Sequence, residues 1–329
     1  MKTISILIPC HNEENNLHYL FEALCDLTLK EAEIHPEGAD TPIIISMKDY
    51  NWKFMFVNDG SSDDTLTILR ELANKDERIT IINLSRNFGK ENAMLAGMDL
   101  IEGNAVIIMD ADLQHPVETI PEMVYWWSKG YDDVYGRRLV RGKESVLRRN
   151  MSMVFYKTLD SIADINTLPN VGDFRLLDRK VIDALRSLRE TQRYTKGLYC
   201  WVGFSKKGVE FCQAERTGGK SSFNFFRLLN LAIDGITDFS TKPLRMASIA
   251  GGIVSFLAFT YMIFIIVKTI IWGEPVTGFP TLICVILLLG GLQLLALGVI
   301  GEYLGRIFNE VKNRPPYIIE SIIKKETES

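Results

Sequence analysis

Histidine and cysteine are scarce in this chain, and those present form no metal-binding pattern. The 329 residues include four histidines and five cysteines. The cysteines are scattered and odd in number, and no pair has metal-ligand spacing. We therefore expect reduced thiols, as in a protein that faces the cytosol. The cysteines are Cys10, Cys25, Cys200, Cys212 and Cys284.

A strong charge imbalance, a leader pattern and a dinucleotide fingerprint are also missing. The net charge of −4 gives no broad electrostatic attraction to nucleic acid. The amino terminus is Met-Lys followed directly by a strand pattern, so we expect no signal peptide. No Gly-x-Gly-x-x-Gly follows that first strand, which argues against a dinucleotide oxidoreductase. The length allows two domains, or one domain with an appendage.

The first half of the chain repeats strand, turn and helix patterns. Apolar runs of strand length occupy residues 4–8, 53–57, 79–84 and 105–108. Such repeats predict an α/β fold with a Rossmann-like, mostly parallel sheet and right-handed crossovers. Residues 28–51 lack clear periodicity and contain proline and glycine turn signals, so we interpret them as a surface insertion.

An acidic cluster follows the run at residues 105–108. That run is uninterrupted and apolar, as in a strand buried on both faces of a sheet. Asp110 and Asp112 come directly after it, followed by Gln114. Their oxygens are hard ligands that suit Mg²⁺ or Mn²⁺, with a bound diphosphate completing the shell. A solvated turn is the alternative, but α/β sheets place ligands at this end of their strands.

Charged residues follow the other strand ends as well. Asp59 lies in a turn after the second strand, and Arg86 and Lys90 follow the third. Beside acidic strand ends, these cations are more plausible as phosphate ligands than as ordinary surface charges. Arg137 opens a basic segment that either meets an anionic substrate or lies on a solvated helix face. The loop at residues 215–222 is basic and rich in glycine, and either closes over a phosphate or is a linker.

The hydrophobic residues are concentrated after residue 245. Residues 246–267 and 279–300 carry no charge, and each run is long enough to span a bilayer. Lys and Arg flank both runs on the same side, which places the flanks in the cytoplasm by the positive-inside rule. Residues 223–244 have the helical spacing of an amphipathic helix that lies on a membrane. We therefore predict a catalytic domain at 1–222, this interfacial helix at 223–244, two transmembrane helices with a short external loop at 245–303, and a cytoplasmic tail at 304–329.

Seven motifs in order give the chain a family resemblance. They are Ile-Pro-x-x-Asn-Glu, Asn-Asp-Gly-Ser-x-Asp, Ser-Arg-Asn-Phe-Gly-Lys, Asp-Ala-Asp-Leu-Gln-His-Pro, Tyr-Gly-x-Arg, Gly-Asp-Phe-Arg-Leu-Leu and Arg-x-x-Gly-x-Ser. The set resembles the family 2 inverting glycosyltransferases of the GT-A fold. Within them it is similar to the polyprenyl-phosphate glycosyltransferases, relatives of dolichyl-phosphate mannose synthase and bacterial bactoprenol glucosyltransferases. The resemblance runs from about residue 3 to residue 316, apart from the insertion.

The resemblance implies three sets of site residues and two catalytic candidates. The nucleotide-binding set is Pro9, His11, Glu13, Asp59, Arg86, Lys90, Asp110 and Ala111. The metal set is Asp110, Asp112 and Gln114, and the phosphate or acceptor set is Arg137, Arg216 and Lys220. Asp112 and Asp173 are the catalytic candidates, and Asp173 stands where the family's proposed catalytic acidic group stands. The last motif departs from the usual Ser-Lys-Tyr or Ser-Lys-Trp, because position 222 is serine and the nearest lysine is Lys220.

The implied activity is transfer of one sugar, with inversion, from a nucleotide sugar to polyprenyl phosphate. UDP-glucose is the first guess for the donor and undecaprenyl phosphate for the acceptor, on a multi-pass protein of the plasma (inner) membrane with its catalytic domain in the cytoplasm. Homo-oligomerisation stays open. The alternatives are a processive polysaccharide synthase and a non-catalytic membrane scaffold. The Gln-x-x-Arg-Trp motif of a processive synthase has only Glu190-x-x-Arg193-Tyr194 as its counterpart here.

Asp173 is expected to position other groups, and not to act as a strong general base. A phosphate monoester has a second pKa of about 6, so the acceptor is already mostly ionised near neutral pH. Removing a proton would then contribute little to the barrier. We expect Asp173 to act through Arg175, Arg137 or a sugar hydroxyl.

Overall fold

The computed structural model describes residues 1–38, 41–139, 171–191, 193–212, 242–272 and 278–325. These residues form an α/β domain and a separate pair of long helices. The strands are β1 Lys2–Cys10, β2 Glu31–Ile34, β3 Ile43–Ser46, β4 Tyr50–Asn58, β5 Ile79–Leu84, β6 Ala105–Ile108, β7 Asp133–Arg138, β8 Val171–Asp178, β9 Lys206–Phe211 and β10 Ile319–Lys324. The helices are α1 Leu17–Thr28, η1 Met47–Asp49, α2 Thr65–Lys75, α3 Lys90–Leu100, η2 Val117–Thr119, α4 Ile120–Ser128, α6 Arg179–Ser187, α7 Thr195–Trp201, α9 Lys242–Trp272 and α10 Phe279–Val311.

An eight-stranded sheet organises the α/β domain. Its order is β10-β5-β4-β1-β6-β8-β7-β9. Strands β5, β4, β1 and β6 are parallel neighbours, whereas β8 and β10 run antiparallel to the strands beside them. The predicted mostly parallel sheet is therefore confirmed. The four parallel strands end at one edge, which brings the turns after them together.

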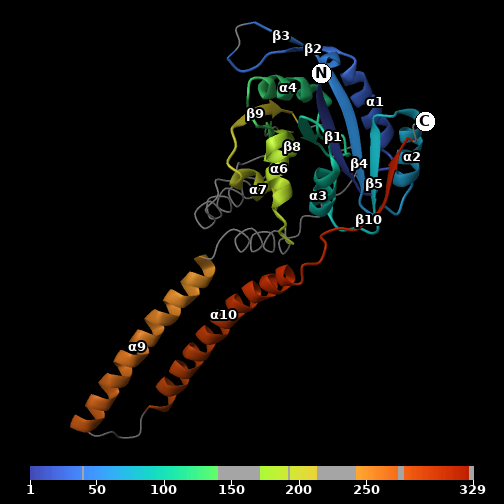
Figure 1. Ribbon diagram of the computed structural model, residues 1–329. Helices are drawn as coiled ribbons and strands as arrows, with labels where there is room; N and C mark the ends of the chain where they lie inside the picture. The colour runs from blue at the N-terminus through green and yellow to red at the C-terminus, as the bar shows by residue number, and fades with distance from the viewer. Residues whose placement is uncertain (39–40, 140–170, 192, 213–241, 273–277, 326–329) are drawn as a thin grey trace. The chain divides into compact units, whose positions relative to one another are not determined.

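Helices cover both faces of this sheet, as Figure 1 shows. On one face, alternate residues of β1, β4 and β6 pack with α1, α2 and α4 in a continuous apolar core. On the other face, α3 lies against β1 so closely that a Cβ on Gly97 would be 2.1 Å from Leu7 Cδ1. A strand covered on both faces has apolar residues at every position. All four residues of β6 are accordingly apolar and buried.

The expected surface insertion at residues 28–51 contains a small sheet of its own. Strands β2 and β3 pair antiparallel, with Glu31 opposite Ser46. The insertion ends earlier than we expected, because Tyr50 and Asn51 already belong to β4 and pair with β1. The indole of Trp52 anchors this junction, since its Nε1 donates to the Met47 carbonyl at 2.8 Å.

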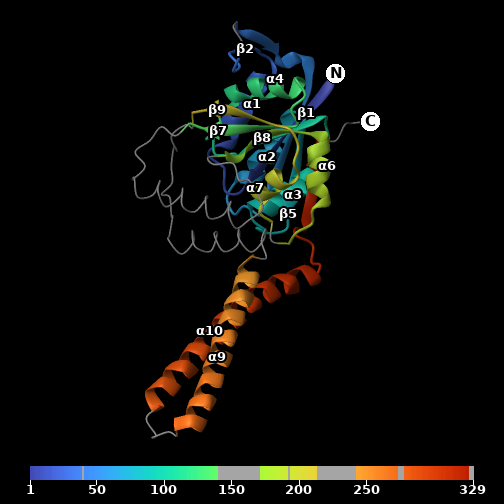
Figure 2. The ribbon, with the colours of Figure 1, turned by 90° about the vertical axis from the view of Figure 1, so that its left-hand side faces the viewer.

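The two long helices, α9 and α10, lie side by side (Figures 1 and 2). Both expose large apolar side chains, such as Phe256 at 69% and Leu294 at 72%. Within the described residues, one stretch meets the length and composition needed to cross a membrane, Leu288–Val311, and none of it is buried inside the protein. The apolar stretch found in α9, Gly251–Tyr261, is shorter. The predicted interfacial helix lies outside the described residues, apart from residues 242–244, which begin α9.

The end of the chain differs from the cytoplasmic tail that we predicted for residues 304–329. Helix α10 continues through Val311, and β10 then pairs antiparallel with β5 at the edge of the large sheet. Tyr317 secures this return, because its hydroxyl donates to Asp99 Oδ2 at 2.5 Å. The α/β domain is thus built from both ends of the chain. The sequence pattern did not predict β10, because the strand is short and its residues, Ile-Glu-Ser-Ile-Ile-Lys, show no regular alternation of apolar and polar types.

This topology predicts different outcomes for two deletions. Removing residues 243–329 takes away β10 and leaves β5 as an unpaired apolar edge, so we expect aggregation or a clearly lower melting temperature. Replacing residues 243–314 with a flexible Gly/Ser linker keeps β10, and we expect a folded, soluble domain. Thermal unfolding and size-exclusion chromatography compare the two. Equal melting temperatures would show that β10 adds nothing to the domain.

Candidate active site

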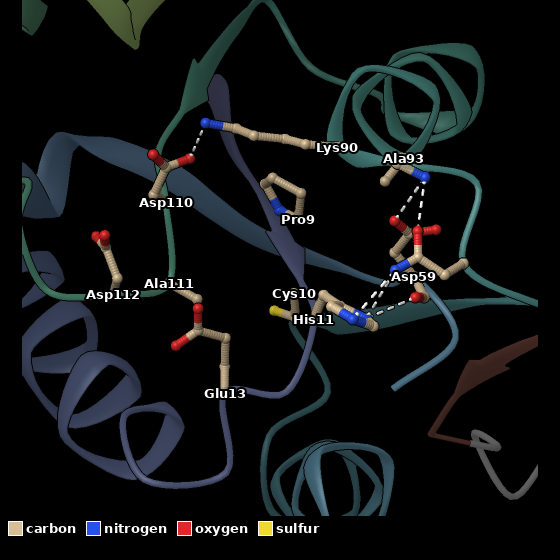
Figure 3. Close-up of a pocket in the computed structure, with 12 residues that line it drawn as sticks. Pro9, Cys10, His11, Glu13, Asp59, Lys90, Ala93, Asp110, Ala111 and Asp112 are labelled. Atoms are coloured by element: carbon tan, nitrogen blue, oxygen red, sulfur yellow. Dashed lines mark hydrogen bonds and ion pairs between the residues drawn. The ribbon is translucent and has the colours of Figure 1, made fainter. Parts of the chain in front are cut away.

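A cavity of about 290 Å³ lies at the carboxyl edge of the parallel strands. Figure 3 shows Asp110, Asp112 and Glu13 toward one end of it and His11 with Asp59 toward the other. The strand ends of β1, β4 and β6 and the loop after β5 all contribute, as the sheet order requires. The lining residues are Pro9, Cys10, His11, Glu13, Asp59, Asn87, Gly89, Lys90, Ala93, Asp110, Ala111 and Asp112.

The acidic loop after β6 is held by its own backbone contacts. Asp112 Oδ1 accepts the Gln114 N–H at 3.1 Å, and His115 Nδ1 accepts the Asp110 N–H at 3.0 Å. Leu113 takes a left-handed φ of 61° in the same turn. The His115 ring stacks on Phe174 of β8, with centroids 4.7 Å apart. Burial lowers the pKa of His115, which keeps the ring neutral and able to accept at Nδ1.

Lys90 joins two carboxylates that the sheet would otherwise leave in repulsion. Strands β6 and β8 are antiparallel, with Ile108 opposite Arg175. Continuing that register by two residues places Asp110 opposite Asp173, and like charges in that position are destabilising. The Lys90 Nζ, at the start of α3, lies 2.6 Å from Asp110 Oδ1 and 2.8 Å from Asp173 Oδ2. Figure 3 shows the lysine reaching past Pro9 to Asp110.

This ion pairing decides the charge state of Asp173. The side chain is 7% exposed, and burial alone would raise its pKa. The positive charges of Lys90, Lys196 and Arg175 outweigh burial, so the pKa of Asp173 is lowered. The same pairing raises the pKa of Lys90 against the opposing effect of burial. Asp173 is therefore a stable anion at neutral pH and a weak base.

Asp59 shapes the opposite wall of the cavity. Its carboxylate accepts the N–H groups of Phe88 at 2.7 Å and Gly89 at 2.9 Å. Its carbonyl lies 2.9 Å from His11 Nδ1, and because a carbonyl only accepts, that nitrogen carries the proton. His11 Nε2 is then free to accept from Asn87 Nδ2 at 3.1 Å. Asp59 thus holds the loop before α3 and, through His11, the end of β1.

Two positions in these loops require glycine, for different reasons. Gly60 has a φ of 60°, and a Cβ there would be 2.4 Å from the backbone of Arg86 and Asn87. Gly89 has a φ of 90° directly before α3, a conformation that glycine adopts without strain. The turn after β4 and the loop after β5 can meet because Gly60 lacks a side chain, whereas a Cβ on Gly89 would meet nothing within 4 Å and only the φ angle there favours glycine.

Most of the predicted nucleotide-binding residues come together. Pro9, His11, Glu13, Asp59, Lys90, Asp110 and Ala111 all line the cavity. Arg86 does not, because its guanidinium lies over the Phe88 ring, 4.2 Å from the centroid, on an exposed surface. Cys10, Asn87, Gly89 and Ala93 also line the cavity and were not assigned from the sequence. Asn87 and Gly89 belong to a motif that was recognised, whereas Cys10 and Ala93 carry no local signal.

Of the other predicted metal and phosphate residues, Asp112 alone lines the described cavity. Asp112 lines the cavity, whereas Gln114 is buried outside its lining. Arg137 is exposed on β7. Arg216 and Lys220 lie outside the described residues.

Arg175, one of the expected partners of Asp173, forms its ion pair with another residue. Arg175 is buried and pairs instead with Asp133, whose Oδ2 is 2.9 Å from its Nη1. Asp173 is paired with Lys90, which sequence spacing could not reveal because the two lie on different elements. Arg193, in the segment compared with Gln-x-x-Arg-Trp, donates to the carbonyls of Leu188 at 2.6 Å and Leu185 at 3.1 Å. It therefore stabilises the end of α6.

The cavity is strongly acidic, and this bears on whether it can hold a cation. In the described part of the chain, no group of three or more His, Cys, Asp or Glu side chains is arranged to bind a metal. Asp110 and Asp112 each have one oxygen engaged, by Lys90 and by the Gln114 N–H respectively. Their second oxygens fit a hard cation that takes its remaining ligands from a bound anion. Burial and the nearby Asp112 and Asp110 charges raise the pKa of Glu13 against the bond from Asn16, which is the effect expected of crowded carboxylates.

The fold and this site define an α/β domain with an acidic cavity at the carboxyl ends of its parallel strands, and comparison with known proteins supplies the family. Residues 5–186 match glycosyl transferase family 2. The chain is 44% identical over 319 residues to the uncharacterized glycosyltransferase sll0501 of Synechocystis, covering 97% of this chain and 95% of that one. It is 41% identical over 317 residues to the bactoprenol glucosyl transferase of Shigella phage SfII, covering 96% and 97%. The chain belongs to glycosyl transferase family 2.

Lys90→Met should make stability depend on pH in a way that identifies the Asp173 pair. The pKa of Asp173 is lowered in the folded state, so the ion pair stabilises the protein above the unfolded carboxyl pKa of 3.8. That contribution is lost as the pH falls through the lower folded value. At pH 7 we expect a loss of about 1–3 kcal/mol, the cost of leaving a buried group unpaired, at the lower end because Lys90 is 41% exposed. The loss should shrink only as the pH falls below 3.8.

Denaturation of the detergent-solubilised protein at pH 7 and at a pH below 3.8 measures this loss. Lys53→Met is the matched control, because Lys53 pairs with Glu102 on an exposed surface, where both side chains are at least 46% exposed. That variant should differ little from the parent at either pH. A pH-independent loss in Lys90→Met would mean that the lysine acts by packing alone.

Proposed function

We propose that this glycosyltransferase moves a single sugar from a nucleotide sugar to polyprenyl phosphate, with inversion of the anomeric centre. The cavity supports this proposal, because its carboxylates follow the ends of neighbouring strands and Lys90, the lysine of its described lining, begins α3 beside them. The name of the 41% identical relative supports a bactoprenol-type acceptor and a glucosyl donor. UDP-glucose is therefore our first choice of donor and undecaprenyl phosphate our first choice of acceptor.

A divalent cation fits this site on grounds of charge. Asp110, Asp112 and Glu13 would repel the negative charge of a diphosphate. Lys90 is the only cation in the described lining, and it does not offset all of this repulsion. Asp110 and Asp112 would hold Mg²⁺ or Mn²⁺ through their second oxygens. The cation would neutralise charge on the departing nucleoside diphosphate.

The protein's own groups would orient the two substrates. The cavity wall built by Asp59, His11 and Asn87 offers fixed polar groups for a nucleoside. Lys90 would stay near the diphosphate while neutralising Asp173, so a dianionic acceptor phosphate would not meet an unpaired carboxylate. Attack by the acceptor oxygen from the face opposite the leaving group would give inversion. Arg137, Arg216 and Lys220 remain proposed contacts of the phosphates.

The membrane assignment is part of the proposal. The exposed apolar surfaces of α9 and α10 are unfavourable in water and suit hydrocarbon. We propose that both helices span the plasma membrane and that the α/β domain lies in the cytoplasm, where it would meet the lipid phosphate at the bilayer surface. The proposed interfacial helix at 223–244 would assist that encounter.

A product analysis tests the activity. Membranes that contain the protein are given polyprenyl phosphate and a panel of labelled nucleotide sugars, and the lipid product is identified by mass. A product carrying one hexose is expected. A long polymer would favour a processive synthase instead, and no transfer from any donor would favour a scaffold.

Asp110→Asn and Asp112→Asn should each lower turnover about 100-fold or more, since each removes a charge and a ligand for a hard cation. A chelator should reproduce this loss in the parent protein, and added Mg²⁺ or Mn²⁺ should restore it. Asp49→Asn, an exposed substitution in η1, is the control. Full turnover in excess chelator would refute the metal assignment.

Asp173→Asn should slow turnover about tenfold to 100-fold through lost positioning of Lys90. The acidic limb of the pH–rate profile should stay near pH 6, at the second ionisation of the acceptor phosphate, which has a pKa of about 6. The lowered pKa of Asp173 places its own titration well below that limb. Disappearance of the limb in the variant, or recovery of activity only at high pH, would identify Asp173 as the base.

A further inference from the structure

Strand β10 pairs irregularly with β5 near the carboxyl end of β5. Ile319 pairs with Leu84 and Ser321 with Asn83, so Glu320 is an extra residue in a β-bulge. Bulges turn a side chain away from its regular direction. Here Glu320 Oε2 accepts from Asn83 Nδ2 at 2.6 Å. The bulge thus places an anion at the outer end of a buried polar pair.

That pair is Asn83 and Asn58, which lie opposite each other on β5 and β4. Both are buried, at 5% and 2% exposed. Asn58 Nδ2 donates to Asn83 Oδ1 at 2.7 Å. Asn58 Oδ1 in turn accepts from Ser61 Oγ at 2.6 Å. Each buried amide therefore uses its nitrogen on one side and its oxygen on the other.

The far end of this series lies at the cavity. Ser61 Oγ accepts the backbone N–H of Asn12 at 3.0 Å. Asn12 takes a left-handed φ of 58° between His11 and Glu13, which both line the cavity. The Asn12 side chain adds a second link, since its Oδ1 accepts the Ser62 N–H at 2.8 Å. The conformation of this loop is therefore set partly by the turn after β4.

All donors in the series point the same way, from Asn12 toward Glu320. A carboxylate only accepts, so Asn83 must present its nitrogen to Glu320 and its oxygen to Asn58. Asn58 must then present its oxygen to Ser61, which leaves the serine oxygen able to accept from Asn12. The charge at Glu320 selects one of the two orientations of each amide.

We propose that Glu320, on the strand that follows α10, is a positioning residue of the nucleotide site. Its carboxylate fixes the Asn83 and Asn58 amides and, through Ser61, the loop that carries His11 and Glu13. That the loop binds a nucleotide rests on the proposed function, whereas the hydrogen-bonded series does not. The proposal predicts that substitutions of Glu320 speed hydrogen exchange at Asn12 most for lysine, less for alanine and least for glutamine. A simple loss of stability would not produce this order.

Hydrogen exchange of the full-length protein in detergent tests the series without any ligand. Glu320→Lys offers only donors and should reverse the Asn83 amide, so we expect the Asn12 amide to exchange about tenfold faster. Glu320→Ala should show a smaller increase, and Glu320→Gln, which keeps an acceptor, should resemble the parent. Ile322→Lys is the control, because it adds a cation at an exposed position of β10 that pairs with Ile82 and not with Asn83. Equal exchange at Asn12 in all variants would overturn the proposal.

Titration calorimetry with UDP and with GDP, each with MnCl₂, tests the consequence for the site. Glu320→Lys should raise the dissociation constant of the nucleotide that binds about threefold to tenfold, and Glu320→Gln should restore it. Faster exchange with unchanged affinity would overturn the positioning role. If the parent binds neither nucleotide, the proposed function fails, and the exchange measurement still decides whether Glu320 fixes the loop.

Discussion

The charge of Lys90 is the constraint on which the rest of the site depends. The ends of the antiparallel strands β6 and β8 bring Asp110 and Asp173 close enough for one lysine to pair with both, and without that cation their negative charges would repel each other. Lys90 enters from α3, whose first turn is set by Gly89 and by the Asp59 carboxylate. A single ammonium group therefore ties the loop after β5 to the ends of β6 and β8.

Much of this arrangement could be predicted from the sequence because the signals are local. A buried parallel strand is uniformly apolar, and the polar residues after it must lie at the carboxyl edge, so Asp59, Asp110 and Asp112 were placed correctly. The partner of Asp173 could not be predicted, because Lys90 on α3 and Asp173 on β8 are far apart in the sequence and no regular residue spacing relates them. The partner of Arg175 could not be predicted for the same reason, since Asp133 lies on β7, the strand that pairs with β8 but is distant from it in the sequence.

Some of the polar residues at the site bond to the backbone of neighbouring loops and so hold the cavity in shape. Asp59 uses both carboxylate oxygens on backbone N–H groups, and His115 uses its ring nitrogen on the backbone of Asp110. A sequence motif does not distinguish residues that contact a ligand from residues that hold the loop, because both kinds stand in the same short segment. The hydrogen bonds distinguish them, and they indicate that part of the recognised pattern encodes the shape of the cavity.

The position of β10 in the chain has a consequence for biosynthesis. A ribosome makes β1 to β9 first, then α9 and α10, and only then the strand that pairs with β5. Until the last residues emerge, β5 presents unpaired N–H and C=O groups along an apolar edge, and nascent chains in that state are prone to wrong pairing. The α/β domain can complete its sheet only after both long helices have been synthesised. Its maturation is thereby timed to follow that of the helices.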